Sequence, residues 1–197
     1  MNVNTQMALR QRLLTLPFDA FASLVARLLP ALGYENVRLA GRHNYRGRNG
    51  RDGAGGFDLL ATKGGRKVLV QLKQFEEVRS LYQRSIDELR GVALRSGAAE
   101  ALLLTTGGFS PTVDREALRR SPIASVVTID GDELVELLHR HRVGVTKDGS
   151  IDEALLEQLV LEARGNGPSD SAGGPSFVVI VGVRRVAKRK PARLLPR

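Results

Sequence analysis

The sequence predicts an α/β fold in which a mixed central sheet is flanked by helices. Apolar residues recur at helical spacing between Phe18 and Leu32, and short apolar runs of strand length follow this segment. Two of these runs, 57–61 and 68–73, are separated by a glycine turn, and the later runs alternate with helical patterns. This alternation implies a sheet with helices packed on its faces.

The N-terminal part of the chain predicts two helices and a strand. Residues 2–14 form a polar extension that can be helical. The next helix starts near Pro17, and its apolar pattern ends at Gly33. Proline is favoured at the start of a helix and glycine just after its end. Pro30 is expected to kink or end the last turn, because proline removes a backbone donor. Residues 37–40 predict a short strand.

A β-hairpin follows, and its turn predicts the strand register. Gly64-Gly65 is a favoured centre for a two-residue turn, because both glycines accept a positive φ at little cost. With this turn, Asp58 falls opposite Gln71, and directly opposed residues have Cβ atoms about 4.5–5.5 Å apart. Side chains alternate along a strand, so Lys73 shares the face of Gln71. An acid, an amide and an amine are therefore predicted to meet at one end of the hairpin.

The second half of the chain continues the alternation of helices and strands. The predicted elements are a helix over 79–96 closed by Gly97, a strand over 101–105, a helix from Pro111 through Arg120, a strand over 125–129, a helix introduced by Asp130-Gly131-Asp132, and a helix over 151–164. Residues 165–176 predict a linker, and Phe177–Val183 predicts a strand that adds an edge or a dimer contact. We accordingly divide the chain into an N-terminal extension (1–16), a main domain (17–142), an accessory helix (143–164), and a linker with a strand and a basic tail (165–197).

The composition favours a polyanionic partner and excludes several kinds of site. The 197 residues include 30 Lys and Arg against 21 Asp and Glu, a formal net charge of +9. Basic segments attract nucleic acid by releasing counterions, although a basic tail can also serve solubility alone. The sequence has no cysteine, which excludes disulfides, thiolate catalysis and cysteine-based metal sites. No stretch approaches 18 apolar residues, so we expect a cytoplasmic protein without a signal peptide or membrane span.

A glycine-rich basic loop leads into the hairpin. Its candidate DNA-binding residues are Arg42, Tyr45, Arg46, Arg48 and Arg51. We expect the arginines to grip the DNA backbone, with the tyrosine stacking or packing beside them. The alternative is a solvated loop without a binding role.

The three polar residues of the hairpin suggest two different roles. The Asp58 carboxylate and the Gln71 amide oxygen are hard donors of the kind that Mg²⁺ accepts, and Mg²⁺ keeps several waters. Lys73 beside them could lower the pKa of a metal-bound water or stabilise charge on a phosphate. Together these groups would suit hydrolysis of a phosphodiester. The alternative is an ordinary ion pair between Lys73 and Asp58.

Over roughly residues 17–140, the chain resembles the catalytic domain of Mrr-type restriction endonucleases, within the PD-(D/E)xK nuclease superfamily. The order and spacing of several short segments carry the resemblance. These segments are Phe18-Asp19, Leu28-Leu29, Leu32-Gly33-Tyr34, Gly55-Gly56-Phe57-Asp58-Leu59, Val70-Gln71-Leu72-Lys73-Gln74-Phe75, Glu88-Leu89-Arg90-Gly91, Thr105-Thr106-Gly107-Gly108-Phe109 and Ile129-Asp130-Gly131. The implied fold is a restriction-endonuclease-like core.

The resemblance assigns roles to individual residues. Asp58 matches the family's metal-binding aspartate, and Lys73 matches its catalytic lysine. Gln71 matches the glutamine that this branch uses where most of the superfamily has a carboxylate, so we expect modest metal affinity. The main-chain carbonyl of Leu72 would be a further metal ligand. Asp19 is either an outer metal ligand or a first-turn acid favoured by the helix dipole.

The implied activity is that of a magnesium-dependent endodeoxyribonuclease, a hydrolase of restriction systems that cleaves DNA, including modified DNA. Mn²⁺ could replace Mg²⁺. The expected partner is DNA, not a membrane, and a homodimer would supply one site for each strand. Two alternatives stay open. The fold could bind DNA as an assembly module without cleaving it, or it could be a structure-selective nuclease similar to Holliday-junction resolvases, which share this core.

Overall fold

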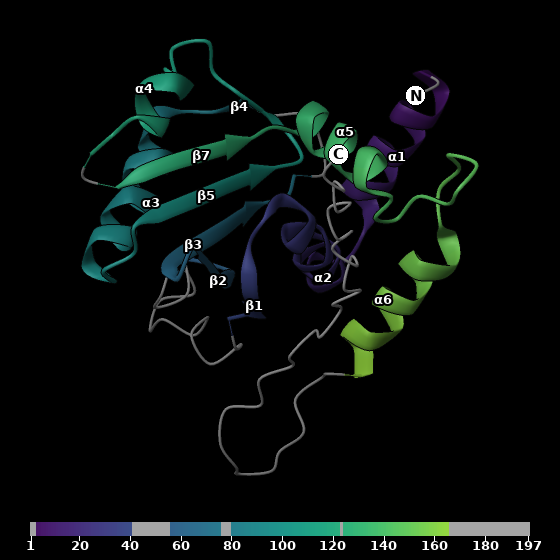
Figure 1. Ribbon diagram of the computed structural model, residues 1–197. Helices are drawn as coiled ribbons and strands as arrows, with labels where there is room; N and C mark the ends of the chain where they lie inside the picture. The colour runs from purple at the N-terminus through teal and green to yellow at the C-terminus, as the bar shows by residue number, and fades with distance from the viewer. Residues whose placement is uncertain (1–2, 41–55, 76–79, 123, 166–197) are drawn as a thin grey trace, which may run out of the picture.

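A mixed five-stranded sheet with the order β1-β2-β3-β5-β7 lies at the centre of the molecule (Figure 1). The computed structural model describes residues 3–40, 56–75, 80–122 and 124–165. The strands of this sheet are Glu35–Leu39 (β1), Leu59–Lys63 (β2), Arg66–Lys73 (β3), Glu100–Thr105 (β5) and Ser125–Ile129 (β7). The first three strands pair antiparallel, whereas β3, β5 and β7 run parallel. The predicted mixed sheet is confirmed.

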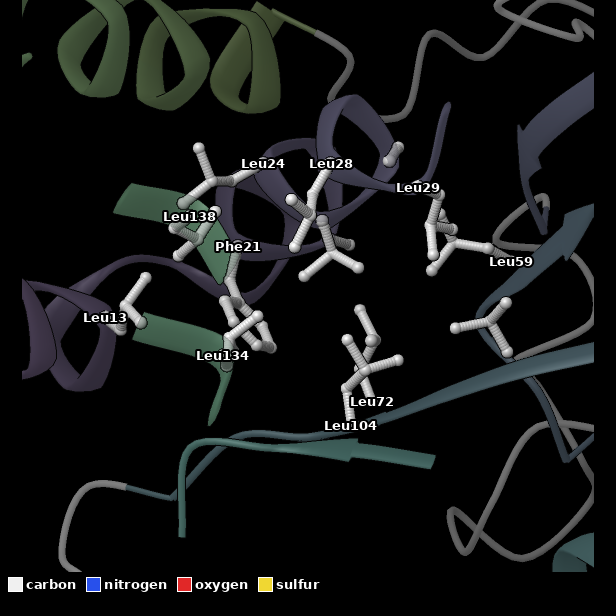
Figure 2. Close-up of a cluster of buried hydrophobic side chains, with 14 of the residues drawn as sticks. Leu13, Phe21, Leu24, Leu28, Leu29, Leu59, Leu72, Leu104, Leu134 and Leu138 are labelled. Carbon is white, nitrogen blue, oxygen red and sulfur yellow. The ribbon is translucent and has the colours of Figure 1, made fainter. Parts of the chain in front are cut away.

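Helices cover both faces of the sheet, and each face has its own hydrophobic core. One core takes residues from Val3–Thr15 (α1), Phe18–Leu28 (α2), Gly131–His141 (α5) and Glu153–Gly165 (α6). Its leucines meet Phe21 above β3 and β5 in Figure 2. The other core takes residues from Gln83–Arg95 (α3) and Arg115–Arg119 (α4). The N-terminal helix α1 is part of this packing, because Leu9 and Leu13 are fully buried in the first core.

Alternate residues of β3 separate the two cores. Val68, Val70 and Leu72 belong to the core shared with α2, whereas Leu69 belongs to the core shared with α3. Because side chains alternate between the faces of a strand, Gln71 projects to the same side as Leu69. The face that carries α3 is therefore the one on which a site around Gln71 must form.

Proline and glycine end α2 as predicted. After Leu28 the chain tightens into the 3₁₀ helix Leu29–Leu32 (η1), which contains Pro30 at its start. Gly33 then takes the left-handed conformation at φ 84°, and its N–H donates to the Pro30 carbonyl at 3.1 Å. A left-handed residue at this position satisfies carbonyls at the helix end, which glycine allows without a steric penalty.

The hairpin turn has the predicted centre and register. Gly64 and Gly65 have φ values of 56° and 75°, the positive values that a type I′ turn requires. The turn pairs Lys63 with Arg66 and Ala61 with Val68. The ladder then ends at the pair Leu59–Val70, one residue short of Asp58.

Two predicted helices are shorter than expected. The helix predicted over 79–96 begins at Gln83, because Ser80–Leu81 forms a strand (β4) that pairs with Gly108–Phe109 (β6). The helix predicted from Pro111 covers only Arg115–Arg119. The Leu81 carbonyl accepts the Ser110 N–H at 2.8 Å, so the backbone there is already engaged outside a helix.

The remaining predictions concern the C-terminal half of the chain. The strands predicted over 101–105 and 125–129 correspond to β5 and β7, and the two helices after them correspond to α5 and α6. The Asp130 carboxylate caps α5 by accepting the Glu133 N–H at 2.9 Å. The predicted linker and strand beyond residue 165 lie outside the described residues.

In the part of the chain that the structure describes, no helix is long and apolar enough to span a membrane.

Replacing Gly131 by alanine tests the packing of α5 against the end of β5. A Cβ at Gly131 would lie 2.4 Å from the Thr106 carbonyl oxygen, and the Gly131 N–H already donates to Gly107 at 2.7 Å. We expect Gly131→Ala to lower the free energy of unfolding by about 1–3 kcal/mol, as overpacking does. Urea denaturation measures this change. Gly108→Ala is the matched control, because a Cβ there meets nothing within 4 Å; equal losses in the two variants would contradict the prediction.

Candidate active site

Asp58 lies where the hairpin ladder ends, and its backbone is fixed on two sides. Its N–H donates to the Val70 carbonyl at 2.7 Å, and its carbonyl accepts the Ala40 N–H at 2.8 Å. Its carboxylate reaches across to β3 and accepts the main-chain N–H of Leu72 at 2.6 Å. A side chain thus binds the two strands together just beyond the last backbone pair.

The environment of the Asp58 carboxyl group favours its protonated form. The residue is only 9% exposed, and this burial raises its pKa from 3.8 to about 6. The Leu72 N–H and the positive charge of Lys73 both lower the pKa, but they offset only part of the effect of burial. Lys73 therefore lies close enough to act on Asp58, as predicted. A carboxyl group with this pKa gains its charge near neutral pH, and a nearby cation would favour that charge.

Gln71 supplies a polar atom without a partner. Its side-chain oxygen Oε1 is buried and accepts no hydrogen bond from the described residues. A buried acceptor without a donor costs about 1–3 kcal/mol, a cost that a bound water or metal ion would remove. Gln71 and Asp58 adjoin the same end of the ladder, where the last paired residues are Leu59 and Val70.

A cavity of about 310 Å³ opens beside Gln71, between the hairpin and α3. It is lined by Gly56, Gln71, Asp87, Glu88, Leu89, Gly91, Val92 and Arg95. Gly56 has a φ of 62°, and a Cβ on it would lie 2.8 Å from a methyl group of Val92. A glycine at this position lets the chain that enters β2 pass directly against α3. The cavity thus lies on the face of the sheet that carries Gln71.

The strand end that carries Lys73 is fixed by two threonines. The Lys73 carbonyl accepts the Thr105 hydroxyl at 2.9 Å and the Thr106 N–H at 3.1 Å. The Thr106 hydroxyl in turn accepts the Phe75 N–H at 2.9 Å. Both threonines are buried, so their hydroxyls serve the backbone of β3. The sequence does not predict this role, because threonine at a strand end has many uses.

Asp19 lies in the first turn of α2 and is half-buried. This helix packs on the face opposite the one to which Gln71 projects. Its role as an outer metal ligand stays a prediction, as does that of the Leu72 carbonyl. The predicted DNA-binding residues Arg42, Tyr45, Arg46, Arg48 and Arg51 lie outside the described residues.

The donor set suits one particular class of metal ion. Among the described residues, no three histidine or carboxylate side chains gather into a group that could hold a metal. The available donors are instead one carboxylate, on Asp58, and one unpartnered amide oxygen, on Gln71. Two hard oxygen donors fit a divalent ion such as Mg²⁺, which keeps several of its waters.

Comparison with known proteins points to a single family. A family profile described as restriction endonuclease matches residues 13–138, a range that contains Asp58, Gln71 and Lys73. No curated protein matches the chain.

Solved structures give a likeness of fold. The chain is similar to the MspJI restriction endonuclease in complex with a 27-mer oligonucleotide, with a TM-score of 0.56 and 21% identity, over 81% of this chain and 36% of that one. The chain therefore spans about a third of the length of that relative. It is also similar to the crystal structure of a protein of unknown function, AF1548, with a TM-score of 0.42 and 14% identity, over 76% of this chain and 67% of that one. The five-stranded sheet with its flanking helices is thus similar to the fold of a restriction endonuclease.

The raised pKa of Asp58 predicts a pH-dependent stability. Between pH 3.8 and about 6 the folded protein holds a proton that the unfolded chain releases, so the free energy of unfolding falls as pH rises through this range. Asp58→Asn cannot ionise and escapes this loss. Relative to the wild type, the variant should gain about 2 kcal/mol between pH 4 and pH 7.

Urea denaturation of both proteins at pH 4, 5, 6 and 7, with a chelator present, measures this difference. A difference between variant and wild type that is constant from pH 4 to pH 7 would contradict a raised pKa for Asp58.

Proposed function

The chain belongs to the restriction endonuclease family, with a catalytic domain of the Mrr type, and we propose that it hydrolyses phosphodiester bonds of DNA in a metal-dependent reaction. One observation carries the proposal. The buried Asp58 carboxylate is held against the strand that carries Gln71 and Lys73, within the influence of the Lys73 charge. An ordinary surface ion pair would not need a buried acid with a raised pKa beside an unpartnered amide oxygen.

The proposed cofactor is Mg²⁺, with Mn²⁺ as a substitute. The Asp58 carboxylate, the Gln71 Oε1 atom and the Leu72 carbonyl would hold the ion. When bound, the ion would supply positive charge to the scissile phosphate and lower the pKa of a water. Glutamine provides a neutral donor where most of the superfamily has a carboxylate, so the site would bind its metal weakly.

The protein's own groups have distinct tasks in this proposal. The Lys73 ammonium group would stabilise the negative charge that grows on the phosphate oxygens in the transition state. At neutral pH, which lies above its pKa of about 6, the Asp58 carboxyl group is mostly ionised, and positive charge in the site would favour the ionised form further. The Leu72 N–H would keep that carboxylate aimed at the site during the reaction.

DNA is the proposed substrate. The formal net charge of +9 favours a polyanion, and the arginines of residues 42–51 are proposed to contact its backbone. The substrate would be duplex DNA of the kind that restriction systems cleave, including DNA with modified bases. A dimer would place one site on each strand, which double-strand cleavage requires.

A cleavage assay separates this function from the two alternatives. The substrates are unmethylated, methylated and four-way-junction DNA with Mg²⁺ or Mn²⁺, and the alternatives are a junction nuclease and a module that only binds DNA.

Replacing Lys73 tests the catalytic assignment. We expect Lys73→Ala to reduce the cleavage rate by about 100-fold or more, because it removes charge stabilisation from the transition state. Cleavage is followed on a gel, and DNA binding is measured with Ca²⁺ in place of Mg²⁺. Lys67→Ala is the matched control, since Lys67 lies at the far end of β3 and donates to the Ser96 carbonyl at 2.8 Å. Similar rates for both variants would remove Lys73 from the mechanism.

Restoring a carboxylate tests the metal assignment. Gln71→Glu adds a negative charge to the proposed donor set, so half-maximal cleavage should need less Mg²⁺ than in the wild type. The measurement is a titration of the cleavage rate with Mg²⁺ at fixed DNA concentration. An unchanged or weaker Mg²⁺ dependence would show that the Gln71 side chain does not contact the ion.

A further inference from the structure

We infer that the N-terminal helix α1 positions the strand end that carries Lys73, and that Gln74 is the positioning residue that joins the two. The inference rests on the proposed function, because it concerns the placement of the proposed catalytic lysine. Most of α1 precedes residues 13–138, the range that the family profile matches. Of the α1 residues described below, Arg10 and Arg12 therefore lie outside the range that the family profile matches, whereas Leu13 and Leu16 lie inside it.

Gln74 directly follows Lys73 and uses its side chain as a double donor. Its Nε2 atom donates to the Leu13 carbonyl at 2.9 Å and to the Leu16 carbonyl at 2.7 Å. The Leu13 carbonyl belongs to the last turn of α1, where helix carbonyls lack intrahelical partners, and Leu16 directly follows the helix. One amide group thus caps α1 and fixes it to the residue next to Lys73.

Arg10 makes a second connection from α1 to the same strand end. Its Nη2 atom lies 3.4 Å from the Thr106 carbonyl, and its Nη1 atom pairs with Asp132 in the first turn of α5. Thr106 in turn binds the backbone on both sides of Gln74, because its N–H donates to the Lys73 carbonyl and its hydroxyl accepts the Phe75 N–H. In Figure 1 the arrowheads of β5 and β7 point toward α1 and α5, so these contacts gather at one edge of the sheet.

A third contact of α1 leads away from the site and supplies a control. Arg12 pairs with Glu153 of α6 at 3.0 Å, and α6 packs mainly against α2. Arg10 and Arg12 thus form two ion pairs on one helix. Of these two arginines, Arg10 also contacts Thr106, beside the strand end that carries Lys73. If α1 served stability alone, loss of either pair would have the same effect on cleavage.

The test compares four single variants of the full chain with the wild type. Gln74→Glu has nearly the same shape but cannot donate to the two carbonyls, whereas Gln74→Lys restores donors at the same position. Arg10→Gln and Arg12→Gln remove the two ion pairs. The readouts are kcat and KM for duplex DNA with Mg²⁺, taken at a temperature at which urea denaturation shows every variant folded.

We expect Gln74→Glu and Arg10→Gln to lower kcat by about 10- to 100-fold with little change in KM, as small displacements of a catalytic group do. Gln74→Lys should recover most of the lost kcat, and Arg12→Gln should match the wild type. Equal kcat values in Arg10→Gln and Arg12→Gln, or no recovery in Gln74→Lys, would overturn the inference.

If the proposed function is wrong, the wild-type protein will cleave none of the DNA substrates. In that case, NMR of the ¹³C-dimethylated Lys73 amine in Arg10→Gln and Arg12→Gln tests the inference. A resonance displaced in Arg10→Gln and not in Arg12→Gln supports positioning by α1. A resonance that is unchanged in Arg10→Gln, or equally displaced in both, overturns it.

Discussion

The hydrogen bond from the Leu72 N–H to the Asp58 carboxylate is the interaction on which the site depends. The paired residues of β2 and β3 end at Leu59–Val70, and one more backbone hydrogen bond joins the Asp58 N–H to the Val70 carbonyl where the polar residues begin. Beyond these backbone contacts, the 2.6 Å hydrogen bond from the Leu72 N–H to the Asp58 carboxylate joins the two segments. This hydrogen bond fixes the carboxylate. Because side chains alternate along a strand, those of Gln71 and Lys73 lie on the opposite face of β3 from Leu72. A purely apolar residue at position 58 would leave the Leu72 N–H without this partner.

This arrangement reduces stability at the site. Burial drives the pKa of Asp58 up to about 6, and the Gln71 oxygen is buried without a hydrogen bond from the described residues. Each feature opposes folding, because a buried charge and an unpaired acceptor both lose the solvation they had in the unfolded chain. Proteins commonly accept such local losses where binding or catalysis requires them. The rest of the domain offsets them with two continuous cores, one on each face of the sheet.

Local signals in the sequence predicted much of this geometry. The Gly64-Gly65 turn was sufficient to predict the register of the hairpin, and Pro30 with Gly33 predicted the end of α2. Local patterns failed to predict the start of α3, because a distant strand pairs with the residues there. Leu81 pairs with Phe109 instead of starting a helix. The role of Gln74 was equally hidden, since its partners Leu13 and Leu16 lie some 60 residues away in the sequence. Periodicity and spacing describe single elements, whereas these contacts depend on which elements meet in three dimensions.

The polar residues gather at one edge of the sheet for a topological reason. The strands β3, β5 and β7 run parallel, so their C-terminal ends lie side by side and the loops that follow them meet there. Lys73 ends β3, Thr105 ends β5, and the Gly107 carbonyl after β5 accepts the N–H of Gly131 after β7. Gly131 permits this approach, because any side chain would collide with the Thr106 carbonyl. Gln74 and Arg10 then join α1 to the same edge, so the position of the lysine is set by contacts on several elements and not by β3 alone.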